Sequence, residues 1–303
     1  MLRGFAAIQS DTPSDLITID KDYLDRVTLR RSLIAQQGRT VHGCTPAGEA
    51  ALREVYTYLF QNYLPTRYPS IFSTSPDGLT LYNTATGCAL PANPPSPLES
   101  LRNIGETVEE DMFILQQTPE GHRSTAFVCC FPAGFNGSEK LDKLLREIHA
   151  PVPGYEKIGA SMERFFSKLE VGKSAKRMNV SHVQNCLLLF ANILQWSIQL
   201  DHTLFKCQSH DTPEDQIDPM AHIDASKGFA RIELQTLTRL PQTRFILFSF
   251  KTYLYPLKDI KDEGLGPDLA DAIEGLDKGN APGMWVYKGS KRWAGPVCEY
   301  LRS

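Results

Sequence analysis

The sequence lacks the cysteine spacing of the common metal and redox motifs. Its seven cysteines form an odd set in which no C-x-x-C occurs, which argues against a zinc ribbon, a thioredoxin-type motif and covalently attached haem c. Ferredoxin-type spacing and a G-x-G-x-x-G loop are also missing, so neither an iron–sulfur cluster nor a dinucleotide site is predicted. Cys129 and Cys130 lie together in an apolar run, and we interpret the cysteines as reduced, intracellular thiols.

Long apolar runs are missing too. The longest, at 186–194, is interrupted by Asn192 and is too short to span a bilayer, and the N-terminal residues lack the apolar stretch of a signal peptide. The net charge is −3 and the Lys and Arg residues are scattered, so electrostatics gives no reason to expect nucleic acid or an anionic membrane as a partner. We therefore expect a cytoplasmic protein that binds neither.

The composition is that of a globular protein with a large core. The 303 residues are 42% hydrophobic and 22% charged, enough for one large domain or two small ones. Residues 66–97, rich in Pro, Ser, Thr, Gly and Asn, predict a long surface excursion, and 280–293 predict turns with short extended pieces. Apolar periodicity predicts helices over 20–37, 45–65, 96–112, 139–149, 155–169 and 267–279 and at the end of the chain, and strands over 112–131 and 231–255. Helices at both ends around four to six mostly antiparallel strands indicate an α+β fold.

Residues 231–255 carry the clearest strand pattern, two runs that flank a turn at 240–243. After the turn both faces are largely apolar, which is typical of a central strand. Before it, alternation places Arg231, Glu233 and Gln235 on one face. A cation, an anion and an amide presented together can bind a polar ligand. The alternative is a solvated outer face with one internal ion pair.

His149 follows a predicted helix and precedes Pro151 and Pro153, so a stiff segment presents its imidazole. Neutral imidazole is a good ligand for haem iron. The alternative is the common one for a histidine at a helix end, where the ring interacts with the last carbonyls.

Two longer motifs contain these residues, IHAPVPGYEKIGASMERFF and RIELQTLTRLPQT…FSFKTYLYPL. They resemble the haem-dependent oxidative N-demethylases, specifically the haem-binding alpha subunit and its fungal relatives. The resemblance continues through DYLDRVTLRRSLIAQQG, YLPTRYPSIF, NIGETVEEDMFIL and CFPAGF…EKLDKLLREIHAPVPG, and so covers nearly the whole chain.

The resemblance implies a single haem-binding domain over 1–303 with a PAS-like core at roughly 105–260. In this core an antiparallel sheet, flanked by N- and C-terminal helices, encloses a pocket for haem b. It also implies a monooxygenase reaction, in which dioxygen activated at the iron oxidises an N-methyl amine to a demethylated amine and formaldehyde.

Four residues match the family positions. The resemblance implies that His149 is the axial metal ligand or a pocket histidine. Arg231 would bind a haem propionate or polarise dioxygen. Glu233 would orient Arg231 or receive the substrate ammonium, and Gln235 would complete the hydrogen bonding. Each residue also has a structural alternative, as an ion pair or a cap.

Such chemistry needs electrons, and the family members that demethylate work with flavin and iron–sulfur partner subunits. A separate reductase, or chemistry driven by peroxide or by no external electrons, is therefore expected. Three alternative functions stay open: a tailoring enzyme that acts on a larger metabolite, a non-catalytic haem or small-molecule sensor, and an interaction protein that lost its cofactor.

One segment departs from the family pattern. Relatives continue arginine–x–asparagine–tryptophan–serine, whereas here residues 180–195 separate Asn179 from Trp196. The 16 residues (195 − 180 + 1) equal 48 nucleotides; Val-Ser can be encoded GTGAGT and the final Gln CAG, the expected ends of a small intron. We interpret the segment as a retained intron. A genuine helix or strand inserted at a loop is the alternative.

Overall fold

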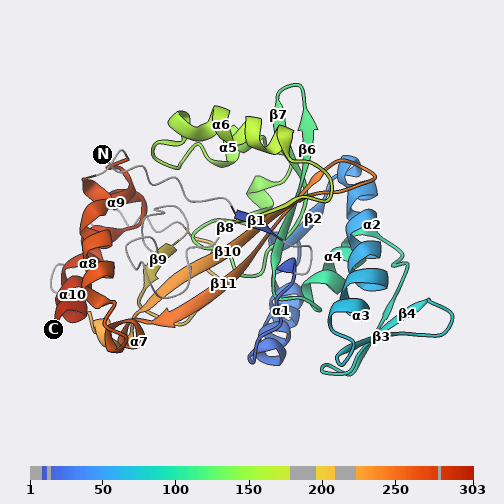
Figure 1. Cartoon of the computed structure of the whole chain (residues 1–303), viewed down its shortest axis with the longest axis horizontal. Coiled ribbons are helices and arrows are strands. Elements are labelled where there is room, and N and C mark those ends of the chain that lie inside the picture. The colour runs from blue at the N-terminus through green and yellow to red at the C-terminus, as the bar shows by residue number, and fades with distance from the viewer. Residues whose placement is uncertain (1–8, 12–14, 178–195, 209–222, 279–280) are drawn as a thin grey trace.

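The structure, a computed structural model, describes residues 9–11, 15–177, 196–208, 223–278 and 281–303. Within these residues eight strands form one antiparallel sheet in the order β1-β8-β10-β11-β6-β7-β2, and β9 also pairs with β10 (Figure 1). Their bounds are β1 Gln9–Asp11, β2 His42–Cys44, β6 Asp111–Thr118, β7 Gly121–Val128, β8 Ser174–Arg177, β9 Trp196–Gln199, β10 Phe229–Arg239 and β11 Ile246–Pro256. The predicted α+β class is confirmed.

β10 and β11 occupy the middle of the sheet. They pair antiparallel along eleven positions each, from Phe229 opposite Pro256 to Arg239 opposite Ile246. The turn predicted at 240–243 joins them. Each strand has a neighbour on its other side, β8 and β9 for β10 and β6 for β11, so the prediction of interior strands is confirmed.

Alternate residues of the central strands enter apolar clusters on opposite sides of the sheet. Met112, Ile114 and Leu247 belong to the α1 face, which is covered by α1 (Tyr23–Gln37), α2 (Glu49–Thr57) and α4 (Pro97–Gly105). Phe113, Leu115 and Phe250 belong to the α6 face, which is covered by α5 (Leu145–Ile148) and α6 (Tyr155–Lys168). The period of two in the sequence therefore divides the core into two layers.

The C-terminal helices form a third cluster at the end of β10 and β9 (Figure 1). They are α7 Leu257–Asp262, α8 Gly266–Glu274, α9 Met284–Tyr287 and α10 Ser290–Arg302. The prediction of turns and extended pieces over 280–293 is wrong for α9 and the start of α10. Met284 and Trp293 are buried in the cluster, and Gly289 at φ 61° separates two short helices whose periodicity is too brief to recognise.

The helix predicted over 139–149 is largely absent. Residues Gly137–Lys140 form a 3₁₀ turn, Asp142 has φ 61°, and only α5 is helical. Leu144 instead bridges Arg123 of β7, so an extended segment next to the sheet replaces most of the helix.

In the N-terminal third the sequence did not predict a small sheet, and the predicted helix end at Pro65 is wrong. Residues 66–97 contain a small antiparallel sheet of β3 Phe72–Thr74, β4 Thr80–Asn83 and β5 Cys88–Pro91, whose turns use Gly78 and Gly87 at positive φ. Pro65 does not end the preceding helix: a π-helical stretch, Tyr58–Tyr63, leads into α3 Leu64–Arg67, where a proline in the first turn is tolerated. The helix predicted over 96–112 is too long: Ser96 caps α4, which ends at Gly105, and β6 begins at Asp111.

A fully buried ion pair joins α1 to the sheet. Arg30 lies with its Nη1 2.5 Å from Asp111 Oδ1 and also donates to the carbonyls of Gly105, Glu109 and Glu110. Asp111 in turn accepts hydrogen bonds from the amides of Cys130 and Phe131 at 2.7 and 2.8 Å. The guanidinium is thereby surrounded by acceptors, as burial of a charge requires.

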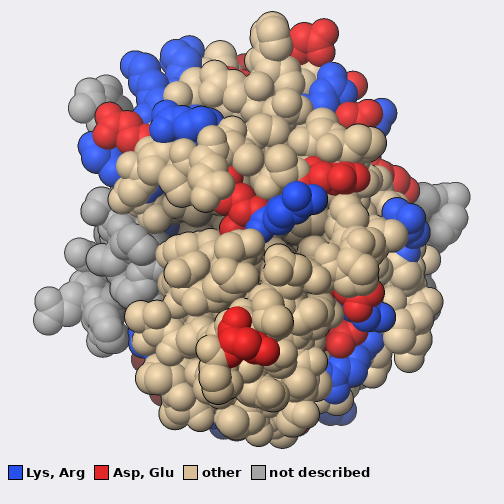
Figure 2. Space-filling view, turned by 90° about the vertical axis from the view of Figure 1, so that its right-hand side faces the viewer, with Lys and Arg blue, Asp and Glu red and all other residues tan. Residues whose placement is uncertain are grey.

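Acidic and basic side chains are interspersed on the side of the molecule that carries α2, α3 and the small sheet (Figure 2). In the part of the chain that the structure describes, none of the helices has the length and apolar character needed to cross a membrane.

Candidate functional site

The polar row of β10 lies on the α6 face. Gln235 is directly opposite Phe250 of β11, and residues opposite each other share a face, so Arg231, Glu233 and Gln235 point to the side that α5 and α6 cover. Gln235 Nε2 donates to Glu233 Oε2 at 3.0 Å. Three adjacent polar groups thus interrupt an otherwise apolar layer.

Arg231 is 2% exposed, and none of the carboxylates in the described part of the chain bonds to it directly. Its Nη2 donates to the carbonyl of Phe131 at 2.6 Å, and its Nη1 donates to the carbonyl of Leu204 at 3.0 Å and lies 3.5 Å from Gln199 Oε1. Its Nε is buried and has no hydrogen-bond partner among the residues that the structure describes. Burial lowers the pKa of Arg231, and the charges of Glu233 and Asp111 oppose this shift. The site therefore holds a cation with one spare donor, which suits an anion.

Glu233 is half-buried beside this cation. Burial raises the pKa of its carboxyl group, whereas the charge of Arg231 and the hydrogen bond from Gln235 act in the opposite direction. A carboxyl group in this setting holds its proton more readily than an exposed glutamate, and when ionised it attracts cations.

Lys288, which directly follows α9, is a second buried cation near the row, and sequence reasoning missed it. Burial lowers its pKa to about 7, and the charge of Glu233 opposes the shift. Its Nζ donates to the carbonyl of Trp196 and lies 4.9 Å from the centroid of the Trp196 ring. No periodic or motif signal marks it, since its position follows from the packing of the C-terminal helices.

His149 directly follows α5 and is half-buried. Its Nδ1 lies 2.8 Å from the carbonyl oxygen of Leu145, so Nδ1 carries the proton and Nε2 keeps a free lone pair. The ring stacks on Tyr155 at 4.9 Å between centroids and 9° between planes. Burial lowers the pKa of His149, the hydrogen bond to Leu145 opposes this, and Lys140 lowers it further. The lowered pKa favours the neutral form of the imidazole.

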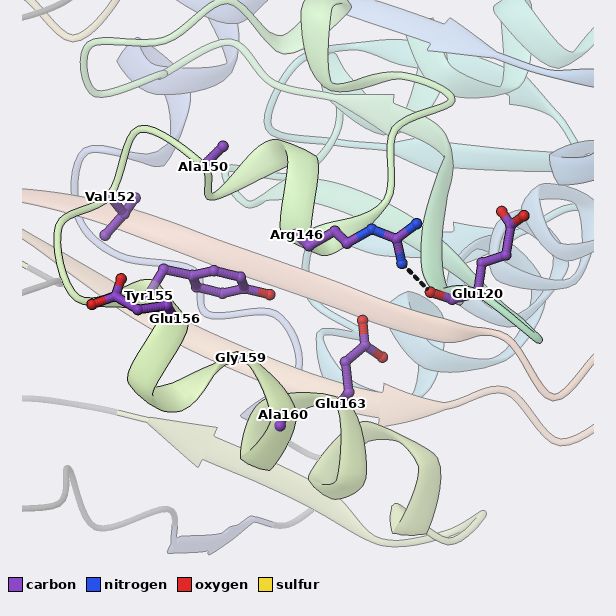
Figure 3. Close-up of a pocket in the computed structure, with 9 residues that line it drawn as sticks. All are labelled: Glu120, Arg146, Ala150, Val152, Tyr155, Glu156, Gly159, Ala160 and Glu163. Carbon is purple, nitrogen blue, oxygen red and sulfur yellow. Dashed lines mark hydrogen bonds between the residues drawn. The ribbon is translucent and has the colours of Figure 1, made fainter.

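A cavity of about 440 Å³ lies between α5 and α6 (Figure 3), and one of its lining residues, Tyr155, stacks on His149. Its charged lining residues are Arg146, Glu120, Glu156 and Glu163. It is also lined by Ala150, Val152, Tyr155, Gly159 and Ala160. Three carboxylates against one guanidinium make this cavity suited to a cationic ligand.

Hydrogen bonds fix two of the charged groups around the cavity. Glu163 accepts hydrogen bonds from the backbone amide of His122 at 3.2 Å and lies 2.5 Å from its Nδ1. Arg146 donates to the carbonyl of Glu120 at 2.6 Å (Figure 3). His149 itself does not line the cavity; Tyr155, which stacks on it, does.

The structure brings Arg231, Glu233 and Gln235 together but does not bring His149 into contact with them. The groups that touch or electrostatically influence His149 are Leu145, Tyr155, Lys140 and Glu163. None of these acts on Arg231. Among the described residues there is also no cluster of three His, Cys, Asp or Glu side chains that could hold a metal ion.

Comparison with known families gives one match over nearly the full length. The family model described as "Haem-dependent oxidative N-demethylase, alpha subunit-like" matches residues 7–298. The match includes both the α5–α6 region and the polar row of β10.

Proposed function

Because the chain belongs to the haem-dependent oxidative N-demethylase, alpha subunit-like family, we propose that it binds haem b and removes a methyl group from an amine. When bound, the haem would supply the activation of dioxygen. The balanced reaction consumes an N-methyl amine, dioxygen, two electrons and two protons, and gives the demethylated amine, formaldehyde and water. The electrons would come from a separate flavin or iron–sulfur reductase. The antiparallel sheet would serve as the PAS-like wall of the pocket.

The geometry of His149 is the observation that carries the proposal. An imidazole that would bind haem iron has to be neutral, with one nitrogen free and the other hydrogen-bonded to fix the ring. His149 meets these requirements, because Nδ1 donates to Leu145, Nε2 is free to ligate and burial lowers the pKa. The stacked Tyr155 ring holds the plane of the imidazole.

Arg231 fits the anionic edge of the same group. Its buried Nε lacks a partner and its charge lacks a contacting carboxylate, so a propionate would satisfy both. The two groups that would hold the haem are thus the imidazole of His149, which follows α5, and the guanidinium of Arg231 on β10.

Glu233 and Gln235 would bind the amine. An ionised Glu233 attracts the substrate ammonium, and its raised pKa makes it a better proton acceptor than an exposed carboxylate. Oxidation at nitrogen or at the methyl group needs the free amine, so removal of the ammonium proton is a useful step. Gln235 holds one carboxylate oxygen and so orients the other.

The test is the absorption spectrum of protein reconstituted with haem. We expect a Soret band that is lost or shifted in His149→Ala and unchanged in His202→Ala, which alters an exposed histidine. Loss of the band in His202→Ala alone would assign ligation elsewhere. A colourless wild-type protein after reconstitution would overturn the proposal, and formaldehyde release with a reductase present would establish the reaction.

A further inference from the structure

β8 and β9 lie along the same edge of β10 and run in the same direction. β8 (174–177) pairs antiparallel with residues 235–238, and β9 (196–199) pairs antiparallel with residues 229–232. Only Glu233 and Leu234 separate the two ladders on β10. A strand that joined β8 to β9 would therefore need two residues between Arg177 and Trp196, a path of about 10 Å for three steps.

The chain has far more residues than this path requires. Eighteen residues separate Arg177 from Trp196 (195 − 178 + 1), so sixteen are surplus (18 − 2). The surplus derived from the register equals the length of the segment 180–195. A continuous strand from β8 to β9 would thus need a chain shorter by that number, a count that refers to no other sequence.

The faces of the two strands agree with this count. Arg177 is opposite Gln235 on the α6 face, and Trp196 is opposite Ile232 on the other face, where it is buried with Ile198 and the C-terminal helices. Two intervening residues preserve that alternation. An odd number would turn Trp196 to the wrong side of the sheet, because one step along a strand reverses the face.

The ends of the segment have the form of intron borders. Val180-Ser181 can be encoded GTGAGT and Gln195 can be encoded CAG, and 16 codons are 48 nucleotides, which keeps the reading frame. We propose that residues 180–195 are translated from a retained intron and that the functional chain joins Asn179 to Trp196. Ser174 to Gln199 then form one strand, which supplies ladder partners to Glu233 and Leu234.

Sequencing of the transcript tests the proposal first. Reads across the codons of Arg177 and Trp196 should give a main product that is 48 nucleotides shorter than the sequence encoding all 303 residues. The proposal is overturned if the mature messages carry the 48 nucleotides.

The purified protein tests the strand itself, and this test does not depend on haem. Deletion of 180–195 should raise Tm by about 5 °C or more relative to the full chain. The continuous strand would gain backbone hydrogen bonds to β10 and would not carry the entropy cost of closing a loop. Deletion of 180–194 is the matched control: it leaves one extra residue, reverses Trp196 and should lower Tm below that of the 16-residue deletion. A 16-residue deletion that unfolds, or that equals its control, would refute the continuous strand whatever the transcripts show.

Discussion

Arg30 and Arg231 are both buried, but their surroundings differ. Arg30 contacts the Asp111 carboxylate at 2.5 Å and donates to three backbone carbonyls, and the charges of its acidic neighbours raise its pKa against the effect of burial. Arg231 donates to two backbone carbonyls and lies at the limit of hydrogen bonding from one amide oxygen; its Nε has no partner, and burial lowers its pKa.

The difference separates a structural arginine from one that suits a ligand. Each nitrogen of the Arg30 guanidinium already donates a hydrogen bond within the protein, so this ion pair joins α1 to β6 and is not suited to bind a ligand. A guanidinium without a contacting anion keeps a positive charge that is not neutralised and an N–H group that is not hydrogen-bonded. A bound anion would neutralise the charge and accept the hydrogen bond. The contrast predicts that loss of Arg30 harms folding and loss of Arg231 harms ligand binding.

The largest expected effect is on the stability of Arg30→Met. Removal of the guanidinium leaves the buried Asp111 side chain without its ion-pair partner, which costs about 3–5 kcal/mol of unfolding free energy. Urea unfolding of the haem-free protein measures it. Arg31→Met is the control, since the neighbouring arginine makes a partly exposed ion pair with Glu106 and should contribute much less. Equal losses in the two variants would remove the distinction.

Arg231→Met should destabilise the haem-free protein less, by about 1–3 kcal/mol, because the carbonyls of Phe131 and Leu204 lose their donors but no carboxylate loses a contacting partner. Its affinity for haem should fall by about tenfold or more through loss of the propionate partner. Haem titration of Arg231→Met and Arg30→Met under conditions where both are folded compares them. Weaker binding by Arg30→Met would contradict the assignment.

The smallest expected effect is a change in the pH dependence of stability in Glu233→Gln. The folded-state pKa of Glu233 lies above the ordinary value of 4.5, so the folded protein holds a proton that the unfolded chain has released. Stability therefore falls as pH rises from about 4.5 through the folded pKa, and then levels off. Glu233→Gln should flatten this decline in Tm between pH 4.5 and 8, whereas Glu263→Gln controls for the loss of one exposed carboxylate. An unchanged slope would place Glu233 in a more solvated setting than its position on β10 indicates.

Local patterns predicted the parts of the fold that repeat. The alternation over 231–255 identified two interior strands and placed Arg231, Glu233 and Gln235 on one face, because the period of two is a property of the backbone. The cap at Ser96 was predicted equally well, and its Oγ accepts a hydrogen bond from the amide of Glu99.

Contacts between distant segments were not predictable from one sequence. Arg30 and Asp111 are 81 residues apart, and neither position differs in pattern from a surface charge until α1 packs on β6. The apolar period over 139–149 predicted a helix, but Leu144 pairs with Arg123 of β7 instead. Here the pairing with a distant strand overrides the local helical preference. Lys288 became part of the site only through the packing of the C-terminal helices against Trp196.

The peptide group of Phe131 joins the two arginine environments. Its N–H is held by Asp111 at 2.8 Å, its carbonyl is held by Arg231 at 2.6 Å, and the guanidinium of Arg30 lies 5.2 Å from the centroid of its ring. A ligand that drew Arg231 toward itself would weaken the hydrogen bond to the Phe131 carbonyl, whereas the hydrogen bond from the Phe131 amide to Asp111 would remain. The rate of hydrogen exchange at the amide of Phe131, or the chemical shift of a fluorinated ring there, would thus report whether a ligand is bound at Arg231. The reporting side chain belongs to the apolar cluster on the α1 face.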